Sequence, residues 1–199
     1  MLDGHRVPSP PLRTQGLLGL LLLRPTLRRR ERLAGVLFPN VTERRGRQRL
    51  SHTLWELRQW LPELPLETNA HSLHLSTESV WLDVVTFEQA ADRDDLASWR
   101  FALALYRGDL LEGLYDDWLL EEREALYLDY VRLAHRVCEA LWQRGELEEL
   151  LPLAEQLSQR EPFDERALRR LMNVYRSVGR RGAALAAYDR FVALAAAEL

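Results

Sequence analysis

A repeat of 34 residues in the C-terminal two thirds of the chain constrains the fold more than any other feature of the sequence. Gly145 and Gly179 lie 34 positions apart, and apolar or aromatic residues recur at the same interval around them. The other matched pairs are Leu141 and Tyr175, Leu150 and Ala184, Ala154 and Tyr188, and Leu157 and Phe191. Paired helices with this period and with glycine in the turn are typical of tetratricopeptide (TPR) repeats. The sequence therefore predicts a TPR-like helical domain, with a plain helical bundle as the alternative.

Helical spacing of apolar residues continues through the whole segment, and glycine or proline separates the predicted helices. These helices are Phe87–Ala91, Leu96–Tyr106, Asp117–Arg144, Leu147–Arg160, Glu165–Val178 and Arg181–Ala197. Four tryptophans with helix or strand spacing are predicted to lie in the core, namely Trp81, Trp99, Trp118 and Trp142. TPR-like arrays present binding surfaces, so this part of the chain is expected to contact a protein partner.

The N-terminal third predicts three helices. The first is expected to begin near Thr14, after two prolines, and to bury the apolar run Leu17–Leu23. That run is too short for a secretory signal or a membrane span, so the protein is expected to be cytoplasmic and not bound to a membrane. A second, short helix is expected to end at Phe38, before a proline. The third helix runs from Arg44 to Leu61, and its leucines form one narrow apolar stripe.

Alternating apolar residues follow the third helix and predict extended structure. Leu66–Thr68 and Leu73–Leu75 form a predicted hairpin around a turn at Asn69, and Val80–Val84 forms a further extended segment. Two short helices, a longer basic helix and then a hairpin are the order of a winged helix-turn-helix. A metal site at His71 and His74 in the hairpin is not expected, because further ligands at a suitable spacing are missing.

The charge of the chain is segregated, although its net value is only −3. All 27 basic residues are arginine. Residues 1–60 carry 12 arginines and 4 acidic residues, whereas residues 61–199 carry 15 arginines and 26 acidic residues. The first part therefore has a charge of +8 and the second a charge of −11. Such asymmetry suggests that the basic part binds a polyanion.

The third predicted helix concentrates side chains that suit nucleic acid. Opposite its leucine stripe lie Arg45, Gln48, His52, Trp55 and Gln59, with Arg44, Arg49 and Ser51 on the flanks. Arginine, glutamine, serine and histidine contact phosphates and base edges in a major groove. The N-terminus of a helix adds a partial positive charge toward phosphate. A solvated charged face is the alternative interpretation of this pattern.

Motifs for catalysis are absent from the sequence. There is no P-loop, no G-x-G-x-x-G, no H-E-x-x-H and no G-x-S-x-G. Cys138 lies in the middle of a predicted helix and is expected to be a buried structural thiol. The acidic run from Asp116 to Glu124 is expected to be the charged start of a long helix. The chain is therefore not expected to be an enzyme or to need a cofactor.

Five stretches of the sequence resemble those of one known family. LLGLLLLRPTLRRRERLAGVLFPN, RQRLSHTLWELRQWL and VWLDVVTFEQA resemble the start of bacterial regulators of the antibiotic regulatory protein (SARP) type. ALALYRGDLLEGLYDDWLLEEREAL and MNVYRSVGRRGAALAAYDRFVALAAAEL are similar to the helical domain of the same regulators. That family joins an OmpR-like winged helix to a TPR-like bacterial transcriptional activation domain (BTAD). The resemblance covers nearly the whole chain and implies a DNA-binding transcriptional activator.

The resemblance also implies roles for particular residues. Helix Arg47–Leu61 is expected to enter the major groove of directly repeated sites, with Arg58 at the position of a backbone-contacting arginine. The helical domain is expected to support self-association or contact with RNA polymerase. The chain departs from the family's pattern at Ser51 and Glu56, where many relatives carry basic residues, and at the arginine-free hairpin tip. A leading strand or more of the usual N-terminal sheet is also expected to be missing.

The predicted fold is thus mainly α. A winged helix-turn-helix with a small hairpin and a truncated N-terminal sheet occupies residues 1–79, and a BTAD/TPR-like helical domain occupies residues 80–199. Double-stranded DNA is the expected partner, and RNA polymerase and a second copy of the chain are candidates. The candidate phosphate contacts are Arg44, Arg45, Arg47, Arg49 and Arg58, and the candidate base contacts are Gln48, Ser51, His52 and Trp55. The alternative is a TPR-like adaptor whose winged helix no longer binds DNA.

Overall fold

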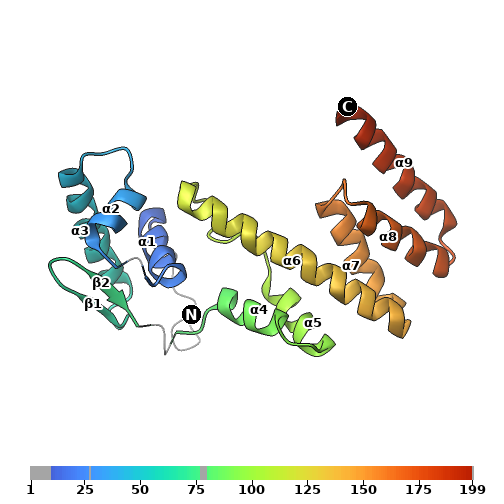
Figure 1. Cartoon of the computed structure of the whole chain (residues 1–199), viewed down its shortest axis with the longest axis horizontal. Coiled ribbons are helices and arrows are strands. Elements are labelled where there is room, and N and C mark those ends of the chain that lie inside the picture. Colours follow the sequence, from blue (N-terminus) through green and yellow to red (C-terminus); the bar gives the residue numbers. More distant parts are fainter. Residues whose placement is uncertain (1–9, 27, 77–79, 199) are drawn as a thin grey trace. The chain divides into compact units, whose positions relative to one another are not determined.

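The computed structural model describes residues 10–26, 28–76 and 80–198. Within these ranges the fold is mainly helical, with nine helices and one two-stranded hairpin (Figure 1). The chain divides into two compact units. Unit 1 comprises Met1–Leu82 and Gly108–Glu124, and unit 2 comprises Asp83–Arg107 and Ala125–Leu199.

Unit 1 begins with three helices and a hairpin, in the predicted order. The elements are α1 (Leu12–Leu23), α2 (Arg30–Leu37), α3 (Glu43–Trp60), β1 (Leu66–Thr68) and β2 (Leu73–Leu75). The two strands are antiparallel, and Leu66 pairs with Leu75. The turn between them forms because the Asn69 side chain accepts hydrogen bonds from the amides of His71 and Ser72, both over 2.8 Å. The predicted hairpin is confirmed.

The core of unit 1 is built almost entirely from leucine. Its fully buried members include Leu17, Leu20, Leu33, Leu37, Leu50, Leu57 and Leu73. The segment 108–124 closes this core with Leu114, Trp118 and Leu119. α1 approaches the segment so closely that a Cβ on Gly19 would lie 2.4 Å from the Leu111 side chain. Two ion pairs at the edge of this core join the first helix and the residue that follows it to the same segment. Arg13 lies 2.5 Å from Asp116, and Arg24 lies 2.7 Å from Glu122.

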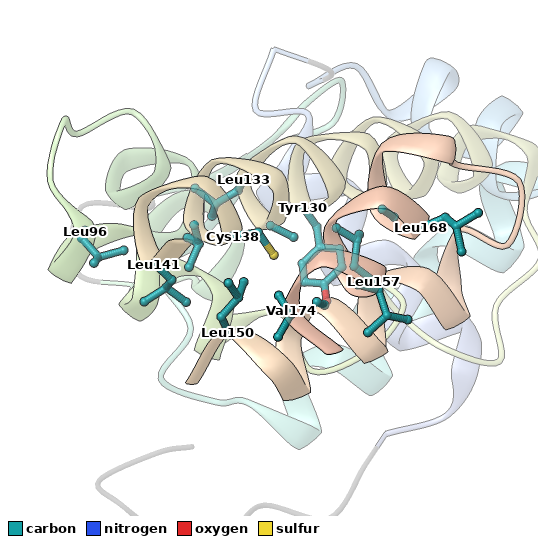
Figure 2. Packing of buried hydrophobic residues seen from close by; sticks show 14 of the residues in the cluster. Leu96, Tyr130, Leu133, Cys138, Leu141, Leu150, Leu157, Leu168 and Val174 are labelled. Carbon is teal, nitrogen blue, oxygen red and sulfur yellow. The ribbon is translucent and has the colours of Figure 1, made fainter. Parts of the chain in front are cut away.

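Among the described residues of unit 2, helices are the only regular elements, and short turns connect them. Its helices are α4 (Asp83–Ala91), α5 (Leu96–Leu105), α6 (Asp117–Arg144), α7 (Leu147–Arg160), α8 (Glu165–Ser177) and α9 (Arg181–Glu198). Helix α6 belongs to unit 1 up to Glu124 and to unit 2 from Ala125 onward. Figure 2 shows Leu133, Cys138 and Leu141 of α6 in the core beside Leu150 and Leu157 of α7. These bounds confirm the predicted helices, with α4 starting four residues earlier than expected.

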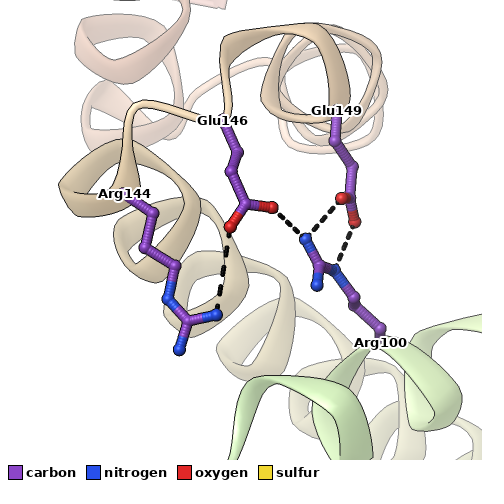
Figure 3. Close-up of polar contacts among 4 residues, drawn as sticks. All are labelled: Arg100, Arg144, Glu146 and Glu149. Carbon is purple, nitrogen blue, oxygen red and sulfur yellow. Dashed lines mark hydrogen bonds and ion pairs between the residues drawn. The ribbon is translucent and has the colours of Figure 1, made fainter.

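A surface ion cluster joins α5 to the start of α7 (Figure 3). The Arg100 guanidinium donates to Glu149, over 2.7 Å from Nε, and also to Glu146. Arg144 lies 3.9 Å from the other oxygen of Glu146. The cluster therefore ties α5 to the turn between α6 and α7.

The two glycines of the repeat adopt the same backbone conformation. Gly145 has a φ of +71° and Gly179 a φ of +77°, in the left-handed region that favours glycine. The next amide donates back to the helix in both turns, from Glu146 to Leu141 over 3.0 Å and from Arg180 to Tyr175 over 2.7 Å. This is the Schellman end of a helix. Two consecutive helix pairs, α6–α7 and α8–α9, therefore follow the 34-residue period.

Two expectations about the start of the helical segment are wrong. Asp83 and Val84 belong to α4 rather than to an extended segment, and the acidic Asp83 in the first turn suits the partial positive charge of the helix N-terminus. Trp81 is 66% exposed instead of lying in the core, because it precedes α4 and shares no apolar stripe with it. Trp118 is buried, and Trp99 and Trp142 are half-buried. The expected shortening of the N-terminal sheet lies outside the described residues.

Candidate nucleic-acid interface

One face of α3 is anchored in the core of unit 1. Leu50, Leu54 and Leu57 are buried, as is Gly46 at the crossing with α2. A Cβ on Gly46 would lie 3.6 Å from the Cβ of Ala34 in α2, so the two helices approach closely there. The leucine stripe predicted from the sequence is thus the packed face, and the opposite face of α3 points to solvent.

All nine candidate DNA-contacting residues are exposed on α3. Arg44 and Arg45 make no ion pair with any residue that the structure describes. Trp55 is 60% exposed, and its ring centre lies 6.1 Å from that of His52. Arginine, glutamine and an exposed aromatic ring therefore share one accessible face at helical spacing.

The flank of α3 that faces the hairpin is held by side-chain hydrogen bonds. Arg30 of α2 donates to the Ser51 hydroxyl over 3.2 Å and to the Asn69 carbonyl over 3.4 Å. Arg58 donates to the Thr68 hydroxyl over 2.5 Å. Ser51 and Arg58 are therefore accessible, but they already link α3 to neighbouring elements.

Two other arginines of α3 have partners within unit 1. Arg47 lies 3.1 Å from Glu43 and 3.5 Å from Glu31, and all three side chains are more than half exposed. Exposed pairs of this kind contribute little free energy, so Arg47 can exchange them for another anion. Arg49 stacks over the Phe38 ring at 6.0 Å, a contact that leaves its positive charge without a counter-ion.

The carboxylate of Glu56 lies between α1 and the exposed face of α3. Its carboxylate accepts a hydrogen bond from Thr14 in α1 over 3.1 Å, and His52 lies 3.6 Å from its other oxygen. Thr14 is itself fully buried. One oxygen of Glu56 is therefore held by α1, whereas the other faces His52, so the repulsion of phosphate that the sequence suggests is only partly reduced.

A short backbone pairing adds basic residues that the candidate set does not include. Arg29 forms an isolated antiparallel bridge with Ser72, and the amide of Leu73 donates to the Arg28 carbonyl over 2.8 Å. Arg28, Arg29 and Arg32 are all exposed. The arginine run is visible in the sequence, but its position beside the hairpin depends on this long-range pairing.

Other sites considered in the sequence have structural explanations. Among the described residues, no group of three or more His, Cys, Asp or Glu side chains could hold a metal ion. Asp116 and Glu122, from the acidic run, pair with Arg13 and Arg24 in α1 and just after it. Cys138 is buried, and burial raises the pKa of its thiol to about 11. In the described ranges no helix is long and apolar enough to cross a bilayer.

Comparisons with known proteins identify the family. Residues 83–199 match the family described as bacterial transcriptional activator domain, whereas no curated protein matches. The whole chain is similar in fold to a solved structure of EmbR from Mycobacterium tuberculosis, described as in complex with a low-affinity phosphopeptide. The TM-score is 0.73 at 22% identity, and the similarity covers 100% of this chain and 57% of that one. The family match covers more than half of the chain, so the protein belongs to the bacterial transcriptional activator domain family, a family of transcriptional regulators, and the predicted kinship with SARP-type regulators is confirmed.

Proposed function

We propose that this protein is a DNA-binding transcriptional activator that reads the major groove with α3. The observation that carries the proposal is the exposed face of α3, where Arg44, Arg45 and Gln48 have no partner among the described residues. Arginine and glutamine there can reach phosphates and base edges, and the helix N-terminus adds positive potential. The charge of +8 in residues 1–60 favours a polyanion in the same region.

The arrangement of unit 1 supports a winged helix. Helix α1 is followed by the bridge at Arg29, then by α2, α3 and the hairpin β1–β2. A bridge beside a hairpin gives the small sheet of such a domain, and α3 takes the place of the recognition helix. Phosphate contacts are assigned to Arg44, Arg45, Arg47, Arg49 and Arg58, and base contacts to Gln48, Ser51, His52 and Trp55.

The helical unit is proposed to contact RNA polymerase or a second copy of the chain. Its match to the bacterial transcriptional activator domain supports a role in activation rather than in DNA recognition. Its repeated helix pairs provide the type of surface that binds polypeptides.

Salt dependence of duplex binding tests the proposal. Duplexes are first selected from a random pool and then titrated by fluorescence anisotropy between about 50 and about 200 mM NaCl. Each phosphate contact contributes about −0.9 to the slope of log K against log salt, so five contacts give a slope of about −4 to −5. Binding that does not depend on salt, or no duplex retained at low salt, would contradict the proposal.

A matched pair of double variants localises the effect. Arg44→Ala with Arg45→Ala removes two unpaired cations of α3 and is expected to make the slope shallower by about 2. Arg93→Ala with Arg107→Ala removes the same charge from exposed positions of unit 2 and is expected to leave the slope unchanged. An equal effect of both variants would mean that only net charge matters.

The second candidate function is a TPR-like adaptor that does not bind DNA. It is favoured by the internal partners of Arg47, Ser51 and Arg58, which occupy three of the nine candidate residues. The variant Arg45→Ala with Arg49→Ala discriminates between the two functions. The adaptor predicts an unchanged set of protein partners and no duplex binding in either protein, whereas the activator predicts a loss of duplex binding.

A further inference from the structure

The outer face of α9 carries an exposed stripe of one arginine followed by three apolar side chains. Arg181, Leu185, Tyr188 and Val192 follow one another at i, i+4, i+7 and i+11 and so share one side of the helix. Leu185, Tyr188 and Val192 are 64%, 49% and 46% exposed. The other side of α9 packs on α8 through Ala184 and Ala187. We call these four residues the α9 stripe.

The internal repeat indicates what fits on this stripe. A shift of 34 residues relates Leu185 and Tyr188 to Leu151 and Ala154 of α7. Ala154 is 1% exposed and Leu151 is half-buried, because α8 packs against α7. Tyr175 of α8 fixes this packing by donating to Glu155 over 2.8 Å. Since α7 and α9 occupy equivalent places in the repeat, one further helix could pack on the α9 stripe as α8 packs on α7.

Charge around the stripe selects the chemistry of that helix. The segment Glu165–Glu198 carries seven arginines and three acidic residues, a charge of +4, whereas the rest of unit 2 has a charge of −6. Arg176, Arg180 and Arg181 are exposed at the turn between α8 and α9. Within the described ranges none of the three pairs with a carboxylate. One end of the stripe is therefore cationic and its other three residues are apolar, with the exposed Asp189 beside Leu185 at i+4.

We propose that the α9 stripe is the docking surface for an acidic amphipathic helix of a partner polypeptide. Apolar side chains of that helix cover Leu185, Tyr188 and Val192, as α8 covers the equivalent face of α7. Its carboxylates lie against Arg180 and Arg181. The inference rests on the proposed role of the helical unit in partner contact, and it assigns that role to a surface and a chemistry.

A designed peptide tests the proposal on the full chain. The probe is a fluorescein-labelled peptide of about 18 residues, long enough to form a helix, with leucine at i, i+3, i+4 and i+7 and glutamate at most other positions. We expect saturable binding that Tyr188→Ser with Val192→Ser weakens by about tenfold or more. Arg180→Glu with Arg181→Glu is expected to weaken it similarly at low salt. Circular dichroism establishes that each variant remains folded.

Matched variants and peptides provide the controls. Phe101→Ser with Leu128→Ser removes two equally exposed apolar side chains elsewhere in unit 2 and should leave the affinity unchanged. Arg93→Glu with Arg107→Glu reverses two exposed charges away from the stripe and should have little effect. A scrambled peptide of the same composition, and one with lysine in place of glutamate, should bind weakly.

Four results would overturn the proposal. They are the absence of saturable binding, equal binding of the lysine peptide, an affinity unchanged in both stripe variants, and a concentration-dependent dimer that Tyr188→Ser dissociates. The last result would assign the stripe to a second copy of the chain. The titration contains no DNA, so Arg44→Ala with Arg45→Ala should leave it unchanged. Failure of the docking proposal is therefore distinguishable from failure of DNA binding.

Discussion

Arg30 donates a hydrogen bond to Ser51 over 3.2 Å and thereby joins the first turn of α2 to the exposed flank of α3. The same guanidinium donates to the carbonyl of Asn69 in the hairpin turn over 3.4 Å. A single arginine of α2 therefore links α3, which carries the proposed DNA-reading face, to the hairpin turn. A planar guanidinium with several fixed donors suits such a bridge, whereas a lysine ammonium lacks that geometry.

Replacement of Arg30 is expected to lower the affinity for duplex DNA, because its side chain links α3 to the hairpin turn, and to lower the free energy of unfolding only modestly. Arg30→Ala removes two partly exposed hydrogen bonds, each contributing about 0.5–1.5 kcal/mol to the free energy of unfolding. Arg30→Lys keeps the charge but cannot make both bonds, so we expect it to bind duplex DNA almost as weakly as Arg30→Ala. Anisotropy titration and urea unfolding measure the two quantities. Wild-type affinity in Arg30→Lys would show that charge alone matters at this position.

The helices were accessible from the sequence because their signals are local. The leucine stripe of α3 is the face that packs, and the helix observed at Glu43–Trp60 is shifted by one residue from the expected Arg44–Leu61. Gly145 and Gly179 end helices as predicted, because a residue with left-handed backbone conformation is needed where each helix ends. Periodicity and turn chemistry therefore define most of the fold.

The parts that the sequence did not reveal depend on contacts between distant residues. The bridge of Arg29 with Ser72 joins positions 43 residues apart and leaves no periodic signal. The hydrogen bond of Glu56 with Thr14 joins two helices through residues that lie 42 positions apart in the sequence, so periodicity within either helix does not reveal it. Trp81 has the spacing of a core residue, but α4 begins two residues after it. The exposed face of α3 was predictable, whereas the partners of its side chains were not.

The glycines of the repeat are expected to be sensitive to alanine for conformational reasons alone. At both Gly145 and Gly179 a Cβ would meet no atom within 4 Å, so steric contact does not add to the cost. Each replacement by alanine is expected to lower the free energy of unfolding by about 1–2 kcal/mol, because an L-residue is strained at positive φ. Urea unfolding followed by circular dichroism measures the change.

Gly182 supplies the matched control for this prediction. It lies in the first turn of α9, and a Cβ there would likewise meet nothing within 4 Å. Because its φ is not positive, Gly182→Ala is expected to leave stability unchanged or raise it by up to about 1 kcal/mol. Equal destabilisation by Gly182→Ala and Gly179→Ala would contradict the conformational explanation.

Because of Asp164, the stability of unit 2 is expected to fall as the pH is lowered into the acidic range. Burial acts to raise the pKa of this carboxyl group, but the amides of Ala167 and Arg166 and the His135 side chain hold it below its ordinary value. A lowered pKa means that the ionised form stabilises the fold above the unfolded pKa of about 3.9 and that this contribution is lost as the pH falls through the folded pKa. Asp164 also caps α8, so Asp164→Ala should cost about 0.5–2 kcal/mol near neutral pH.

The variant Asp164→Asn separates the charge from the cap. Asparagine is an equally good cap, so the variant loses the carboxylate that contacts the His135 ring and keeps the start of α8. We expect it to be less stable than the wild type near pH 6 and to approach the wild type as the pH falls below about 4. Glu165→Gln, at an exposed neighbouring carboxylate, is the control and should change stability little. A constant difference at every pH would exclude ionisation of Asp164 as the cause.

The thiol of Cys138 is expected to be unreactive in the folded protein. It is 1% exposed among Leu141, Val137 and Tyr130 in the core of unit 2, and burial raises its pKa to about 11. Very little thiolate therefore exists at a pH of about 8, and a reagent cannot reach it without an opening of the core. With Ellman's reagent we expect a slow reaction under native conditions and a fast, stoichiometric one in urea. The variant Asp164→Ala should speed the native reaction, because a less stable α8 opens this core more often, whereas a fast reaction of the wild-type protein in buffer would mean that α6 exposes Cys138 in solution.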